Sequence, residues 1–115
     1  MSPTKKQRTE PNLKGRVTKL ADLVEFQPDA IVSREVVHKK AGSVTVFAFD
    51  RGQRLSEHSA PFDALIYGLE GDAEVSLSGE PHRLGKGEMI ILPATKPHSL
   101  RALSPFKMVL VMVKS

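Results

Sequence analysis

From Pro28 onward, glycine and proline residues separate short apolar segments, and these frequent turn-forming residues strongly limit the possible folds. The segments are too short for helices, which usually need at least about 10–12 residues. Alternating residues 73–77 predict a half-exposed strand, whereas segments 43–50 and 64–69 are apolar on both faces. The strands expected are Ile31–Val37, Ser43–Asp50, Ala64–Leu69, Ala73–Leu77, His82–Leu84, Met89–Leu92 and Phe106–Val113. The chain is therefore expected to be all-β, as a sandwich, a jelly roll or a barrel.

The chain before Pro28 has a different character. Residues 1–17 are polar, charged and without a hydrophobic period, so they are expected to form a flexible basic tail. Residues 18–115 are then a single domain, as the length of 115 residues suggests. Val17, Leu20 and Val24 have helical spacing, which predicts a short helical turn, with an edge segment as the alternative.

The charge of the chain is concentrated at its start. Residues 1–19 hold six basic residues and one acidic residue, a net +5, which leaves −1 for the remainder of a chain whose total is +4. A basic tail can bind nucleic acid through phosphate contacts. No aromatic residue lies among these charges, so a base-stacking surface is disfavoured and nucleic acid is not expected as a partner.

The composition excludes several classes of site. The chain has no cysteine, which excludes disulfides, thiolate metal sites and a cysteine nucleophile. No apolar run approaches the ~20 residues of a membrane span, and we expect a cytoplasmic protein without membrane contact. The sequence also lacks a glycine-rich phosphate loop, a serine nucleophile elbow and paired carboxylates, so NTPase, serine hydrolase and glycosidase activities have no support.

Two glycine- and proline-containing stretches each carry one histidine, at residues 52–71 and 87–98. Their spacing resembles the two motifs of the cupin superfamily. The positions that match are Gly52, His58, Gly71, Gly87, Pro93 and His98. The positions that depart are Ala60 in place of a second histidine, Ala64 in place of a glutamate, Thr95 in place of a glycine and Ala102 in place of an asparagine. The chain thus resembles a small single-domain cupin of the cupin 2 conserved-barrel type with a degenerate metal-binding motif.

This resemblance implies a jelly-roll barrel, also called a double-stranded β-helix, over roughly residues 43–113. It also implies that His58 and His98 point into one cavity of that barrel. Two imidazoles can bind Zn²⁺, Ni²⁺, Fe²⁺ or Cu²⁺. Structural zinc sites normally use four protein ligands and catalytic sites three, so the protein ligand set for a divalent metal is incomplete.

Three hypotheses for the histidine pair stay open. The pair binds a divalent metal whose coordination is completed by water, or it consists of cavity residues hydrogen-bonded to each other, to water or to backbone. As in some cupins, one histidine is instead a metal-free general base, with Asp63 as the orienting carboxylate. By alternation, Asp63 and Glu57 should point away from the positions that face the cavity. His38 and His82 are expected on the surface.

The rest of the cavity is expected to be apolar. Alanine at positions 60 and 64 should enlarge it and favour a small apolar or amphipathic ligand held by the two histidines. Side chains expected to face the cavity in some mixture are Met89, Ile91, Met108, Leu110 and Met112. Arginines considered for the cavity mouth, although each is more simply a surface residue, are Arg54, Arg83 and Arg101.

The function is therefore interpreted as binding of a divalent metal, a small molecule or both in the barrel cavity, without an assigned activity. The alternative is a metal-dependent dioxygenase, isomerase or lyase acting on a small organic acid or sugar derivative, and no catalytic residue is assigned. The resemblance also implies a homodimer, formed by strand exchange or sheet packing. The apolar segment Ser43–Phe49 would suit that interface.

Overall fold

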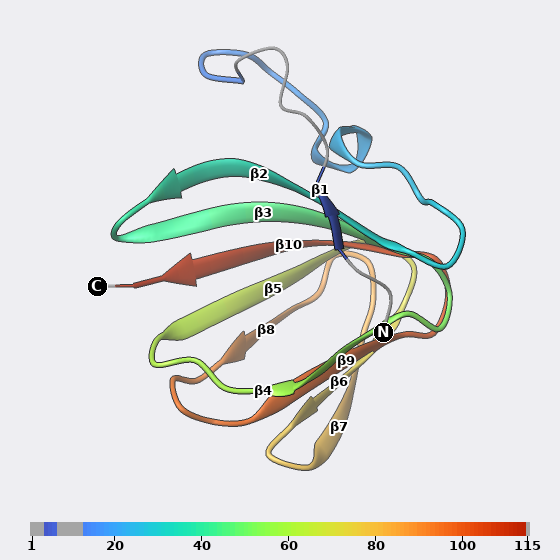
Figure 1. The fold of residues 1–115 in the computed structure, drawn as a ribbon, viewed down its shortest axis with the longest axis vertical. Coiled ribbons are helices and arrows are strands. Elements are labelled where there is room, and N and C mark those ends of the chain that lie inside the picture. The colour runs from blue at the N-terminus through green and yellow to red at the C-terminus, as the bar shows by residue number, and fades with distance from the viewer. Residues whose placement is uncertain (1–3, 7–12, 115) are drawn as a thin grey trace.

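The computed structural model describes residues 4–6 and 13–114 (Figure 1). One single-turn 3-10 helix, η1, spans Leu20–Leu23. The strands are β1 (Thr4–Lys6), β2 (Ile31–Lys39), β3 (Gly42–Phe49), β4 (Arg54–His58), β5 (Asp63–Glu70), β6 (Ala73–Leu77), β7 (Glu80–Leu84), β8 (Met89–Leu92), β9 (His98–Ala102) and β10 (Phe106–Val113). The expectation of an all-β fold is confirmed, and each segment expected to be a strand is one.

The strands form two facing sheets, as in a jelly roll. The larger sheet has the order β1-β2-β3-β10-β5-β8, and the smaller sheet has the order β4-β9-β6-β7 (Figure 1). The neighbours β3–β10 and β10–β5 are far apart in sequence and pair antiparallel along most of their lengths. These crossovers wrap the chain into a barrel, so that residues from both ends of the sequence face one interior.

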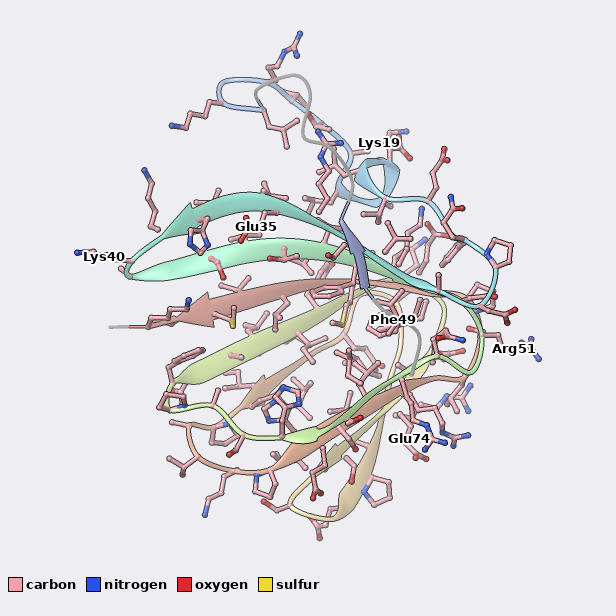
Figure 2. The ribbon with its side chains drawn as sticks, viewed as in Figure 1. Lys19, Glu35, Lys40, Phe49, Arg51 and Glu74 are labelled. Atoms are coloured by element: carbon pink, nitrogen blue, oxygen red, sulfur yellow. The ribbon has the colours of Figure 1, made fainter. Side chains whose placement is uncertain are left out.

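Apolar side chains fill the space between the sheets. Phe49 and Phe106 are fully buried, with their ring centroids 5.9 Å apart. Figure 2 shows Phe49 in the space between the sheets, whereas Glu74 points outward from the smaller sheet. Alternation along β3 thus separates a core face from an outer face, as its sequence predicted.

A second apolar cluster covers one end of the outer face of the larger sheet. Val46 and Ala48 of β3 are fully buried there against Leu23 and Val24, which belong to η1 and the residue after it. The helical turn expected before Pro28 is therefore confirmed, and its role is to cover the sheet. Both faces of β3 are occupied within the chain, and the strand lies between β2 and β10. The expectation that Ser43–Phe49 offers a dimer interface is wrong for most of this strand.

The proposed flexible tail falls mostly outside the described residues. Residues 1–3 and 7–12 are not described, and Thr4–Lys6 pairs in parallel with Ile31–Ser33 of β2. The flexibility of residues 1–17 stays a prediction. In the described ranges, no helix has the length and apolar character needed to cross a membrane.

Gly71 occupies the tight turn between β5 and β6. Its φ of 72° lies in the left-handed region, and a Cβ atom at this position would overlap the carbonyl oxygen of Pro105. Gly52 has a similar φ of 81°, but a Cβ atom there would meet nothing within 4 Å. The two motif glycines thus share a backbone conformation and differ in the space around them.

We expect Gly71→Ala to lower the free energy of unfolding more than Gly52→Ala does. The left-handed conformation alone costs about 1–2 kcal/mol in both variants, and only Gly71→Ala adds an overlap with backbone. Urea denaturation followed by circular dichroism measures both values. Equal losses would show that the Pro105 segment moves freely and that close packing is not the role of Gly71.

Candidate functional site

His58 and His98 meet at the open end of the strand pair β4–β9. His58 is the last residue of β4, His98 is the first residue of β9, and the antiparallel register places them opposite each other. The register shifts between Leu55 and His58, so β4 is irregular just before its histidine. Such irregularities bend a strand and redirect its side chains. The structure therefore brings together the two motif histidines, which are 40 positions apart in sequence.

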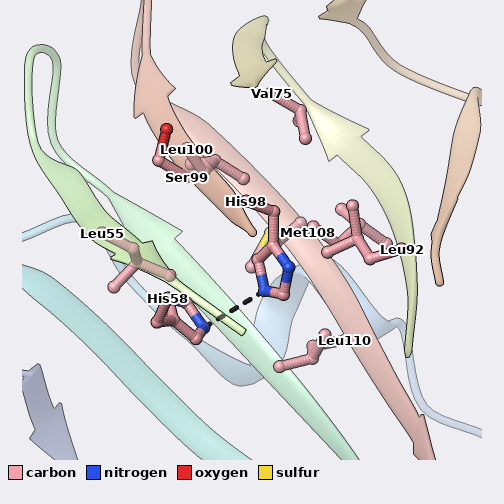
Figure 3. Close-up of a pocket in the computed structure, with 10 residues that line it drawn as sticks. Leu55, His58, Val75, Leu92, His98, Ser99, Leu100, Met108 and Leu110 are labelled. Carbon is pink, nitrogen blue, oxygen red and sulfur yellow. Dashed lines mark hydrogen bonds between the residues drawn. The ribbon is translucent and has the colours of Figure 1, made fainter. Parts of the chain in front are cut away.

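The two imidazole rings face each other through their Nε2 atoms (Figure 3). The Nε2–Nε2 distance is 3.2 Å, and the rings meet edge to face at 68° with their centroids 4.4 Å apart. The Nδ1 atom of His58 lies 2.8 Å from the carbonyl oxygen of Ser56. The Nδ1 atom of His98 lies 3.2 Å from the carbonyl oxygen of Lys96. Each ring is thus oriented by the backbone two residues before it.

These contacts require a positive charge that two neutral imidazoles do not supply. A carbonyl oxygen only accepts hydrogen bonds, so each Nδ1 must carry a hydrogen to make its contact. A neutral imidazole has only one N–H, so a ring that carries its hydrogen on Nδ1 has only a lone pair on Nε2. The Nε2 lone pairs of the two rings then face each other. Two lone pairs at 3.2 Å repel unless a positive charge lies between them. Either a proton or a metal ion satisfies this arrangement.

The environment of His98 disfavours its protonation. Burial lowers the pKa of His98, the hydrogen bond to the Lys96 carbonyl opposes this, and charge on His58 lowers the pKa further. His98 is accordingly neutral near pH 7 and keeps its Nε2 lone pair. A neutral imidazole is the form that binds metals.

An apolar cavity of ≈ 40 Å³ lies beside the histidine pair. A water molecule needs about 10–15 Å³ of such space, so the cavity has room for about three waters or a ligand of a few atoms. Its remaining lining comes from both sheets and is Leu55, Ile66, Val75, Leu92, Ser99, Leu100, Met108 and Leu110 (Figure 3). The expected combination of apolar walls and a polar histidine end is present.

The two alanines of the degenerate motif do not shape this cavity. Ala64 is buried in the core between the sheets, and the cavity lining includes neither Ala64 nor Ala60. The expectation that these alanines enlarge the cavity is therefore wrong. Met108 and Leu110 line the cavity as expected, whereas Met112 packs against the core beside it. Met89 and Ile91 are about half exposed instead.

Neither nearby carboxylate contacts the histidine pair. The Oδ1 atom of Asp63 accepts a hydrogen bond from the Ala94 backbone N–H at 2.8 Å. Both Nδ1 atoms face carbonyl oxygens, so Asp63 orients neither imidazole ring in this structure. Glu57 lines a separate groove beside β4, β6 and β9. Among residues 4–6 and 13–114, no group of three or more potential metal-binding side chains gathers.

The other charged candidates lie on the surface. His82 on β7 is exposed, and His38 on β2 is exposed beside Glu35, with 3.0 Å between Nδ1 and Oε2. Arg83 pairs with Asp72 at 3.2 Å, and Arg101 lies 3.6 Å from Glu74. Arg54 and Arg101 line the groove that also contains Glu57. None of the three arginines lines the histidine cavity.

Sequence reasoning missed the two backbone carbonyls that orient the imidazoles. A carbonyl group belongs to every residue, so Ser56 and Lys96 carry no side-chain signal for this role. The contribution of Ser99 to the cavity was also missed, because serine is common on exposed strand positions.

Comparison with known proteins establishes the family. Residues 45–114 match the family model described as the cupin domain. The chain belongs to the cupin family. No protein with a curated description matches this cupin.

Solved structures agree with that assignment. A conserved protein of unknown function from Streptococcus pyogenes is 37% identical, with a TM-score of 0.85 over 91% of this cupin and 93% of that chain. A cupin 2 conserved barrel domain protein from Leptotrichia buccalis is 40% identical, with a TM-score of 0.79 over 82% of this cupin and 46% of that chain. KdgF from Halomonas sp. is 26% identical, with a TM-score of 0.71 over 80% and 84% of the two chains.

We expect His98 to make the metal-free protein less stable as the pH falls through the ordinary range of histidine. The lowered pKa means that the unfolded chain binds the proton first, so stability is full above about pH 6.5 and decreases towards the folded pKa. Urea denaturation in chelator between pH 7.5 and 5 should therefore show a steeper decrease for wild type than for His98→Ala. A steeper decrease for His98→Ala than for wild type would mean that the two rings share a proton and that protonation stabilises the pair.

Proposed function

We propose that this cupin binds a divalent transition metal through the Nε2 atoms of His58 and His98, with water or a small ligand completing the coordination. The observation that carries the proposal is the pair of converging Nε2 atoms, whose rings are both held by carbonyl oxygens through Nδ1. This is a common arrangement for metal-binding histidines, whose second ring nitrogen donates to a carbonyl, a carboxylate or water.

The spacing of the two donor atoms fits a metal ion. With metal–nitrogen bonds of about 2.0–2.1 Å, the 3.2 Å separation corresponds to an angle of about 100° at the metal, close to tetrahedral. Zn²⁺, Ni²⁺, Fe²⁺ and Cu²⁺ all accept imidazole nitrogen. The adjacent cavity has space for the waters that a site with two protein ligands needs.

The size of the cavity supports a binding module for a small ligand. Pockets for drug-sized ligands usually measure about 300–1,000 Å³, whereas this cavity measures ≈ 40 Å³. The ligand is therefore water, or a group of a few atoms with an apolar part that contacts Leu55, Met108 or Leu110.

A metal-dependent enzyme is the second candidate function. The observation in its favour is that two protein ligands leave coordination positions free for a substrate and for water, as catalytic metal sites require. A dioxygenase, isomerase or lyase fits this chemistry best with a small organic acid, because a sugar derivative exceeds the space beside the histidines.

A homodimer also belongs to this proposal, because the family resemblance implies one. Exposed apolar side chains outside β3, the strand first expected to form the interface, support a homodimer. They are Val37, Tyr67, Met89, Ile91 and Val113.

We expect wild-type protein to bind one divalent ion per chain and the His58→Ala/His98→Ala variant to bind none. Inductively coupled plasma mass spectrometry on untagged protein, supplied with Zn²⁺ and then dialysed, measures the content directly. His82→Ala is the matched control, because His82 is an exposed histidine outside the site. Absence of metal from the wild-type protein after supplementation would overturn the proposal.

The single substitution His98→Ala should weaken metal binding more than it weakens the fold. Loss of an outer-sphere partner already costs about 10–100-fold in metal affinity, and loss of one of two ligands should cost more than that. His98 is only partly buried, so the free energy of unfolding at pH 7.5 in chelator should change little. Titration with Zn²⁺ and urea denaturation give the two values, and unchanged metal affinity would show that His98 is not a ligand.

A further inference from the structure

A polar groove crosses the outer face of the smaller sheet, over β4, β9 and β6. Its volume is ≈ 410 Å³, within the range of about 300–1,000 Å³ that is usual for small-molecule pockets. Leu55 and Leu100, which also line the groove, pack inward against the core, so the side chains next to them in β4 and β9 point outward. Figure 2 shows Glu74 of β6 on this outer side. The charged side chains of the polar groove are Arg54, Glu57, Glu74 and Arg101.

An irregularity in β4 turns two consecutive polar side chains towards the polar groove. Counted from the inward Leu55, strict alternation would place Ser56 outward, Glu57 inward and His58 outward. The register with β9 shifts between Leu55 and His58, and both Ser56 and Glu57 line the polar groove while His58 lines the cavity. Such irregularities re-aim side chains and are frequent beside functional sites. The same irregularity therefore presents His58 to the cavity and Glu57 to the polar groove.

The charges of the polar groove are incompletely paired. Arg54 lies directly opposite Arg101 in the register of β4 with β9, and like charges in such positions destabilise a sheet. Arg101 has a carboxylate nearby, because its guanidinium nitrogen lies 3.6 Å from Glu74 Oε1. Among the residues that the structure describes, neither Arg54 nor Glu57 forms an ion pair. The polar groove therefore presents one cation and one anion that the described chain does not neutralise.

We propose that the polar groove binds a small zwitterion, a molecule with one carboxylate and one ammonium group, as in a free amino acid. The carboxylate fits between Arg54 and Arg101, because a guanidinium group binds a carboxylate through two parallel hydrogen bonds. A carboxylate in this place would also remove the repulsion between the two arginines. Glu57 accepts the ammonium group, and Ser76 and Ser99, which lie opposite each other on β6 and β9, offer hydroxyl groups to the same ligand.

The balance of charge favours a zwitterion over a simple anion or cation. Two arginines and two glutamates line the polar groove, so its formal net charge is zero. An anion held by Arg54 would leave Glu57 unpaired and near a second negative charge, and a cation held by Glu57 would leave the two arginines repelling each other. Only a ligand with both charges pairs all of these groups. Such pairing gives specificity, because ligands of either single charge meet repulsion.

This proposal does not depend on metal binding by the histidine pair. Leu55, Ser99 and Leu100 line both the polar groove and the cavity, so the two spaces lie on opposite faces of the β4–β9 pair. None of the four charged residues of the polar groove lines the cavity. The two sites can therefore be tested separately in one protein.

The test is a titration of the isotope-labelled full chain, followed by nuclear magnetic resonance, with ω-amino acids from glycine to 6-aminohexanoate. Each probe is compared with its carboxylate-only and ammonium-only analogues of the same length. At least one zwitterion should bind at least about 10-fold more tightly than both analogues, because it forms charged hydrogen bonds at both ends. The shifted signals should be confined to β4, β6 and β9.

Substitutions assign the binding to the polar groove. Arg54→Gln and Glu57→Gln should each weaken the preferred zwitterion at least about 10-fold and abolish its advantage over the analogues. Arg51→Gln and Glu80→Gln are the matched controls, since both residues are exposed and outside the polar groove, and they should leave the affinity unchanged. Unchanged signals elsewhere in the spectrum check that each variant is folded.

The outcomes separate this site from the histidine pair. Binding that persists in the His58→Ala/His98→Ala variant supports the polar groove, whereas binding lost in that variant would assign the ligand to the histidines and overturn the proposal. A zwitterion that binds no more tightly than its carboxylate-only analogue, or no binding at millimolar concentration, would also overturn it. None of these results changes the metal content by which the proposed function is judged.

Discussion

Apolar packing between the two sheets holds the strands of both histidines over the larger sheet. Phe49 and Phe106 lie opposite each other on β3 and β10 and fill the interior. Leu100 of β9 belongs to the same core and also lines the histidine cavity. The contacts that stabilise the fold therefore also set the size of the site. A cavity whose walls are core side chains cannot widen without loss of packing.

The histidine pair shows how the backbone can orient two side chains towards each other. Both imidazoles are oriented by carbonyl oxygens two residues earlier in the chain, at Ser56 and Lys96. Their converging lone pairs repel each other unless a positive charge lies between them. The lowered pKa of His98 disfavours a proton in that place near neutral pH. Ala64 belongs to the buried core between the sheets and offers no donor atom to the histidine pair.

The fold could be predicted from the sequence to a large extent because the local signals were strong. Glycine and proline marked the turns, and alternation placed β6 and the two faces of β3 correctly. The spacing of the two motifs predicted that His58 and His98 share one site. The prediction failed at Met89 and Ile91, which lie on the outer face. Alternation shows which residues share a face, but it does not show which face is inside when both are apolar.

The sequence by itself determined the strand segments, the turns and the two histidines that share a site, because these depend on residue type and on short spacings. Only the tertiary structure decided the register of β4 with β9, the carbonyl contacts of His58 and His98, and the cavity of ≈ 40 Å³. It also decided that η1 covers only one end of the larger sheet. These features arise from contacts between segments distant in sequence, and their free energy depends on packing that no local pattern encodes.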